Sequence, residues 1–288
     1  MEYFVHIGIL ICVYGMVALS LNLVVGETGM ISVAQAAFSG IGAYVTALLL
    51  LALGINFFLA VILSMLAAGA IAFLVGAIFT RLQEVYYVFG TVGFNVILYT
   101  VLLNWNSVTR GPLGIPGIPR PELFGFIFSD NHMFLGLALA SLAAIYGLCT
   151  FIKNSSFGRV LHAIREDEEA TSVFGYATHH YKLAVFTIAA MFTAYASGLY
   201  ATYISYIDPS TFALPESIFI LAMIILGGLS STRGAVLGAF LLVILPEALR
   251  FVGFPSDIAA QMRQMTYGLV LVLLMLYRPQ GILGKFRI

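Results

Sequence analysis

Charged residues are scarce in this sequence. Asp, Glu, Lys and Arg together make up 9% of the 288 residues, whereas hydrophobic residues make up 61% and the mean hydropathy is +1.02. A soluble domain carries about 25% charged residues, so this chain has too little charge to cover a water-facing surface. The composition predicts an all-α polytopic membrane protein in which residues 1–288 form a single transmembrane domain.

The sequence also lacks a basic excess, a CxxC pair and a His/Cys cluster, which argues against nucleic-acid binding and against a metal site. The net charge is zero, so no basic excess indicates a nucleic-acid partner. The two cysteines, Cys12 and Cys149, lie within apolar runs, where a thiol behaves as a small hydrophobe. No CxxC pair and no His/Cys cluster indicates a metal site.

Catalytic motifs are missing as well. The sequence contains no HExxH, GxSxG or intramembrane GxGD motif, so we predict no catalytic residue. It also lacks GxxxxGK[ST], because Gly284-Lys285 has no matching glycine upstream and is followed by Phe286. The chain therefore cannot hydrolyse ATP through a P-loop, and we expect it to bind no cofactor of its own.

Long apolar runs are what the sequence has in abundance. A helix needs about 20 apolar residues to cross the hydrocarbon core, and this rule predicts eight to ten transmembrane or re-entrant helices. The predicted segments are 4–25, 34–53, 55–79, 85–103, 132–152, 183–203, 215–229, 234–250 and 264–278.

Lys and Arg distribute unevenly between the two sides that these segments define. With a cytoplasmic C-terminus, the larger group lies inside: Arg81, Lys153, Arg159, Arg165, Lys182, Arg233, Arg278, Lys285 and Arg287. The smaller group lies outside: Arg110, Arg120, Arg250 and Arg263. Because positive residues favour the cytoplasmic side, this bias orients the chain. The proline- and glycine-rich connection 104–131 is then a turn-rich external loop.

The inner connection 153–182 is the only strongly charged stretch. Its acids Glu166, Asp167, Glu168 and Glu169 suit the N-terminus of a short helix that continues through residues 170–174, and Gly175 suits the left-handed stop after it. Such a helix between two spans would dock a cytoplasmic partner. A merely solvated loop is the alternative.

Polar residues within apolar segments are candidates for a translocation path. Glycines interrupt the hydrophobic pattern at both ends of residues 26–42, as expected of a broken helix that lines a cavity. The candidates are Asn22, Gln35, Ser39, Tyr44 and Asn95. Amides in a membrane also join helices, so that alternative stays open. The acids Glu84, Glu216 and Glu247 are expected to face water or partners at span ends.

The sequence resembles the permeases of bacterial ABC importers for branched-chain amino acids, closest to the subunit type usually called M. The resemblance rests on residues 18–29 (ALSLNLVVGETG), 36–44 (AAFSGIGAY), 114–118 (GIPGI), 157–159 (FGR) with 163–168 (AIREDE), 226–229 (LGGL) and 277–284 (YRPQGILG). These segments occur in order along nearly the whole chain.

The resemblance implies a multi-pass protein of the bacterial inner membrane that works in a complex. Its expected partners are a second homologous permease, two cytoplasmic ABC ATPases and a periplasmic or lipid-anchored substrate-binding protein. ATP and Mg²⁺ would be bound by the ATPases. Residues 159–175 would form the coupling loop, with Arg159, Arg165, Gly175 and the four acids between them inserted into the ATPase.

Two other functions remain as alternatives. An importer of urea or short amides would fit the broader family. An ion-coupled secondary transporter would fit the broken helices, but it usually needs an ionisable group deep in the membrane, and none is evident from the sequence.

Overall fold

The computed structural model describes residues 2–123, 126–128, 130–250, 268, 272 and 280–284. In these residues the long helices are α1 (Glu2–Thr28), α2 (Gln35–Leu53), α3 (Phe57–Phe79), α4 (Glu84–Asn104), α6 (Asn131–Asn154), α9 (Thr178–Ile204) and α11 (Thr232–Arg250). Shorter helices are α5 (Asn106–Thr109), α7 (Ser156–Glu166), α8 (Glu168–Val173), α10 (Leu214–Gly227) and the 3₁₀ turns η1 (Gly111–Leu113) and η2 (Pro209–Phe212).

The predicted all-α membrane fold is confirmed. Six of the described helices are long and apolar enough to cross a membrane, namely α1, α2, α3, α4, α6 and α9, and α10 is a shorter apolar helix. Eight of the nine predicted segments coincide with α1, α2, α3, α4, α6, α9, α10 and α11. The ninth, 264–278, lies outside the described residues except for 268 and 272.

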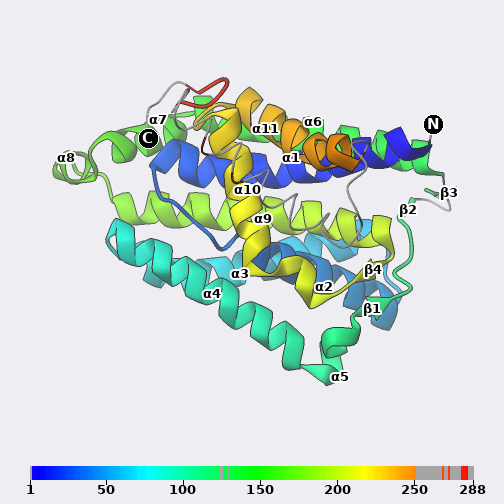
Figure 1. Cartoon of the computed structure of the whole chain (residues 1–288). Helices are drawn as coiled ribbons and strands as arrows, with labels where there is room; N and C mark the ends of the chain where they lie inside the picture. Colours follow the sequence, from blue (N-terminus) through cyan, green and yellow to red (C-terminus); the bar gives the residue numbers. More distant parts are fainter. Residues whose placement is uncertain are drawn as a thin grey trace.

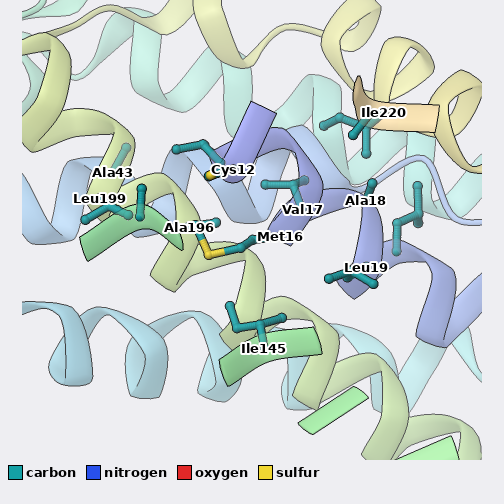
Figure 2. Close-up of a cluster of buried hydrophobic side chains, with 14 of the residues drawn as sticks. Cys12, Met16, Val17, Ala18, Leu19, Ala43, Ile145, Ala196, Leu199 and Ile220 are labelled. Carbon is teal, nitrogen blue, oxygen red and sulfur yellow. The ribbon is translucent and has the colours of Figure 1, made fainter. Parts of the chain in front are cut away.

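The centre of the molecule is built around α1 and α9. Along α1 nearly every residue from Cys12 to Thr28 is buried, because α6, α9, α10 and α11 surround it. Figure 2 shows Met16 of α1 near Ala196 of α9, with Ile145 of α6 and Ile220 of α10 in the same cluster. Cys12 is buried in this cluster and Cys149 is also buried, as expected of small hydrophobes.

Small residues allow the helix backbones to approach closely. A Cβ atom on Gly42 of α2 would lie 2.4 Å from Cα of Ala194 on α9. On the last two described helices, a Cβ on Gly238 would lie 1.9 Å from the carbonyl oxygen of Met223, and one on Gly234 would lie 2.5 Å from that of Gly227. Gly234 and Gly238 thus form a GxxxG pair at the α10–α11 interface, where only glycine leaves room for the facing backbone.

The helices α2 and α10 interrupt the regular arrangement. Residues 29–34 after α1 form an irregular segment, and α2 begins only where this segment has passed into the bundle (Figure 1). Gln35, the first residue of α2, donates to Oγ1 of Thr193, the sixteenth residue of the 27-residue helix α9, so α2 begins well inside the bundle. In Figure 1, α10 runs across the long helices, joining the region of α2 to α11.

Residues 280–284 close the end of α10. The amides of Ile282 and Leu283 donate to the carbonyl oxygens of Leu226 and Gly227, at 3.0 and 2.9 Å. These carbonyls would otherwise be unpaired at the helix C-terminus. The two segments that carry the late part of the sequence resemblance, 226–229 and 277–284, are thus in direct contact.

In its described residues the connection 104–131 is rich in turns, as predicted. It contains α5, η1 and three two-residue strands: β1 (Ile115–Pro116), β2 (Glu122–Leu123) and β3 (Phe126–Ile127). Strand β1 pairs antiparallel with β4 (Tyr206–Ile207), so this loop is tied to the C-terminal end of α9. Strands β2 and β3 pair with each other.

Candidate functional site

A cluster of polar side chains lies where α2 and α10 begin. The amide of Ala36 donates to Oγ of Ser217 at 2.9 Å, and Nδ2 of Asn95 donates to the same oxygen at 2.8 Å. Nε2 of Gln35 donates to Oγ1 of Thr193. We call Gln35, Asn95, Thr193 and Ser217 the α2–α10 polar cluster. Asn95 is the twelfth residue of the 21-residue helix α4, so this cluster lies well inside the membrane.

The start of a helix carries partial positive charge because its first amides have no partner within the helix. In the α2–α10 polar cluster two such starts face each other, and Ser217 bridges them. Oδ1 of Asn95 is buried and has no hydrogen-bond partner. The arrangement places one open acceptor, Oδ1 of Asn95, beside paired amide and hydroxyl groups at membrane depth, where a polar solute could exchange for those internal bonds.

The structure brings together only some of the predicted path residues. Gln35 and Asn95 belong to the α2–α10 polar cluster, and Ser39 lies one turn further along α2 and lines a small cavity beside it. Asn22 lies elsewhere: its Oδ1 accepts from the amide of Ser230 at 3.1 Å and holds the α10–α11 connection. Tyr44 is buried against Phe212, with ring centroids 6.1 Å apart.

The cavity beside Ser39 holds an acid that the sequence placed elsewhere. We expected Glu216 to face water or partners, but it lies in the first turn of α10 and its carboxylate accepts a hydrogen bond from Tyr14, the thirteenth residue of the 27-residue helix α1. The expectation was wrong because α10 crosses the bundle, so its start lies near the middle of α1 and not at a membrane surface.

A second and larger cavity opens at the end of the bundle where α7 and α8 lie. Its volume is about 580 Å³, and it lies beneath residues 28–31, the start of α4 and the loop after α7. Arg165, Glu168 and Lys182 line it together with apolar residues such as Val85 and Val88. Residues 32–34 lie between this cavity and the α2–α10 polar cluster. They are held there in part by the amide of Val33, which donates to Thr91 at 3.2 Å.

The charged inner loop forms two helices. Asp167 begins α8: its side chain accepts from the amide of Ala170 at 2.8 Å. Gly175 has φ +90°, the predicted left-handed stop. Glu168 pairs with Lys182 at 2.7 Å and ties α8 to the start of α9, while Glu169 is exposed. Glu166, predicted at a helix start, is the last residue of α7, because the chain is already helical from Ser156 onward.

Helix α7 was not predicted, although its sequence is amphipathic. Leu161 and Ile164 are buried, whereas Arg159 and Glu166 are exposed. Two of its polar residues nevertheless point into the bundle: Arg165 donates to the carbonyl oxygen of Gly26, and His162 lies 2.6 Å from Glu27. Arg159, by contrast, is exposed and bonds to Ser156 at 2.9 Å. Burial lowers the pKa of the Arg165 guanidinium, an effect that Glu27 and Glu166 oppose.

The contacts of Glu27 form what we call the Glu27 network, made of Glu27, Lys153, His162 and Ser230. The carboxylate is buried, with Oε1 at 2.9 Å from Nζ of Lys153 and Oε2 at 2.6 Å from Nε2 of His162. Lys153 also donates to Ser230, at the turn between α10 and α11. The network thus joins α1, α6, α7 and the α10–α11 turn. Sequence reasoning missed it, although the polar break at residues 26–29 was a signal.

The comparisons with known proteins agree with this architecture. Residues 3–276 match the family model described as branched-chain amino acid transport system / permease component. The high-affinity branched-chain amino acid transport system permease protein LivM of Escherichia coli is 35% identical over 98% of this chain and 70% of its own length. BraD of Pseudomonas aeruginosa and LivH of E. coli, permease proteins of the same kind of system, are 28% and 27% identical over 94% of this chain and 92% and 91% of their own lengths. No solved structure matches significantly.

Proposed function

The chain belongs to the family of branched-chain amino acid transport system permease components, and from this premise we propose that it imports leucine, isoleucine and valine as one half of a two-permease channel. It is a multi-pass protein of the bacterial inner membrane and a permease subunit of an ABC importer. Its relatives are named as permeases for branched-chain amino acids, and the assignment of these substrates to this chain is part of the proposal.

The observation that carries a translocating role is the meeting of two helix starts inside the membrane. The α2–α10 polar cluster places amide and hydroxyl groups in a region where lipid offers none. An amino acid's carboxylate suits the positive ends of α2 and α10. Apolar residues surround the cluster, which fits a substrate with an aliphatic side chain.

The coupling loop supports dependence on external ATPases. Helices α7 and α8 project between α6 and α9 at the end where Lys153 and Lys182 lie. Through the Glu27 network, a displacement of α7 would reach the turn between α10 and α11, and α10 carries Ser217 of the polar cluster at its other end. We propose that two cytoplasmic ATPases, which bind ATP and Mg²⁺, drive transport through this connection.

The proposed complex also contains a second permease of the LivH type and a periplasmic or lipid-anchored binding protein. E. coli LivH and LivM are both permease proteins of a branched-chain amino acid transport system. A docking surface for the binding protein would lie at the external end, where β1 and β4 tie the 104–131 loop to α9.

The test is purification from native membranes in mild detergent, followed by reconstitution. Recovery of a second permease and two P-loop ATPases, with ATP-dependent uptake of leucine, isoleucine and valine, is the expected result. Saturating uptake of urea or short amides in preference to these amino acids would show that the substrate is one of those compounds and not a branched-chain amino acid.

A secondary transporter is the second candidate, and Glu216 favours it, because an acid inside the membrane is the feature that ion coupling requires. Uptake by this chain alone, driven by a proton or sodium gradient without ATP, would establish that mechanism and refute the importer. The variants Glu168→Gln and Gly175→Val separate the two mechanisms. An importer should lose uptake and keep its assembled complex, whereas a secondary transporter should be unaffected.

A further inference from the structure

Glu216 lies inside the membrane without a cation beside it. Among the residues that the structure describes, no Lys, Arg or His nitrogen lies within 4.0 Å of its carboxylate. The hydrogen bond from Tyr14 is its polar contact. A charge in the membrane interior is costly unless it is paired, and an ionisable residue there marks a functional site by default. The group therefore either carries a proton or receives a positive charge from a ligand.

The surroundings of Glu216 form a cavity of about 30 Å³. That space holds a group about the size of one water molecule, which is also the size of a primary ammonium group. The cavity lies between α1, α2, α9, η2 and α10. Hydroxyl groups of Ser39 and Ser197 line it and can accept from an ammonium group.

Tyr14, Tyr200 and Thr211 also line the cavity, and its remaining walls are apolar. Val13 and Val17 come from α1, Phe212 from η2 and Ile220 from α10. Neighbouring residues of α10 thus serve two sites: Ser217 contacts the positive start of α2, and Glu216 contributes a carboxylate to the cavity. These features match a solute whose carboxylate lies near the start of α2, whose ammonium group lies near Glu216 and whose aliphatic side chain contacts the apolar walls.

We propose that Glu216 binds the α-ammonium group of the transported amino acid during its passage through the membrane. This inference rests on the proposed function and names the group that the site recognises. The cavity accommodates the ammonium group alone in the present conformation. Because the carboxylate pairs with an ammonium group, Glu216 discriminates zwitterions from carboxylic acids that lack the amine.

The experiment uses the complete complex in proteoliposomes and measures leucine uptake together with ATP hydrolysis. Glu216→Gln keeps the shape of the side chain and resembles its protonated form, whereas Glu216→Asp keeps the charge. We expect at least a tenfold loss of leucine transported per ATP in Glu216→Gln, with hydrolysis stimulated by the binding protein within twofold of wild type. Glu216→Asp should recover part of the uptake.

The matched control is Glu2→Gln, because Glu2 is an exposed glutamate at the outer end of α1. It should transport as wild type does. Wild-type uptake and stoichiometry in Glu216→Gln would overturn the inference and make Glu216 a neutral hydrogen-bonding group. Equal loss in the Gln and Asp variants, or failure of both to assemble, would also overturn it, because the charge would then not be what matters. Failure of the wild-type complex to transport any branched-chain amino acid would instead refute the proposed function.

Discussion

Replacing Glu27 by Gln tests whether the Glu27 network is a stabilising electrostatic contact. The substitution keeps the side-chain volume and removes the negative charge between Lys153 and His162. Removing one partner of a buried ion pair costs about 3–5 kcal/mol, whereas an exposed pair is worth about 0–1 kcal/mol. The Glu27 side chain is 2% exposed, but Lys153 and His162 are 22% and 30% exposed and can be partly hydrated. We therefore expect a loss of about 2–3 kcal/mol.

The assay measures the free energy of unfolding of the purified complex. The complex is unfolded by titration with SDS, and unfolding is followed by tryptophan or tyrosine fluorescence. The Glu2→Gln variant is the control, because Glu2 is exposed in the first turn of α1, and it should change the free energy of unfolding by less than about 0.5 kcal/mol. A double-mutant cycle of Glu27→Gln with Lys153→Met isolates the pair. We expect a coupling energy of at least about 1 kcal/mol, and additivity within about 0.5 kcal/mol would refute the reasoning.

Three other predictions concern helix packing, the coupling loop and the polar cluster. Gly42→Val should reduce the yield of assembled complex at least fivefold in size-exclusion chromatography, because its Cβ would lie 2.4 Å from the Cα of Ala194; a wild-type yield would contradict this packing. Asp167→Ala should cost about 1 kcal/mol of α8 stability by removing its N-cap, and faster hydrogen exchange in residues 168–173 measures that loss. Asn95→Leu removes the donor to Ser217 at 2.8 Å and should slow leucine uptake roughly tenfold with the complex intact, whereas unchanged uptake would make the amide a dispensable helix contact.

The membrane-spanning helices could be predicted from the sequence because the thickness of the membrane fixes their length. A helix of about 20 apolar residues is the shortest that crosses the hydrocarbon core, so the runs 34–53 and 85–103 could be read directly and coincide with α2 and α4 within a few residues. Local chemistry was equally informative at Gly175, because a left-handed residue after a short helix favours glycine.

The charged connection 153–182 shows where a local pattern was only partly sufficient. The run of acids indicated one helix start, whereas the structure has a helix ending at Glu166 and another beginning after Asp167. The charges that dominate the sequence concealed the apolar face of α7, on which Leu161 and Ile164 are buried. The apolar face of α7 can be recognised only in the folded structure, where α1 and α6 pack against it.

By itself, then, the sequence determined that this is a helical membrane protein, where its spans lie and which family it resembles, because each follows from residues close together in the chain. Only the tertiary structure decided which polar groups meet. Asn95 and Ser217 are 122 residues apart, and Glu27 and Ser230 are 203 apart. Glu216 reaches Tyr14 because α10 runs across the bundle. The direction of a short helix among its neighbours is set by the packing of glycines and side chains from several helices at once, which a hydrophobic pattern along one segment does not contain.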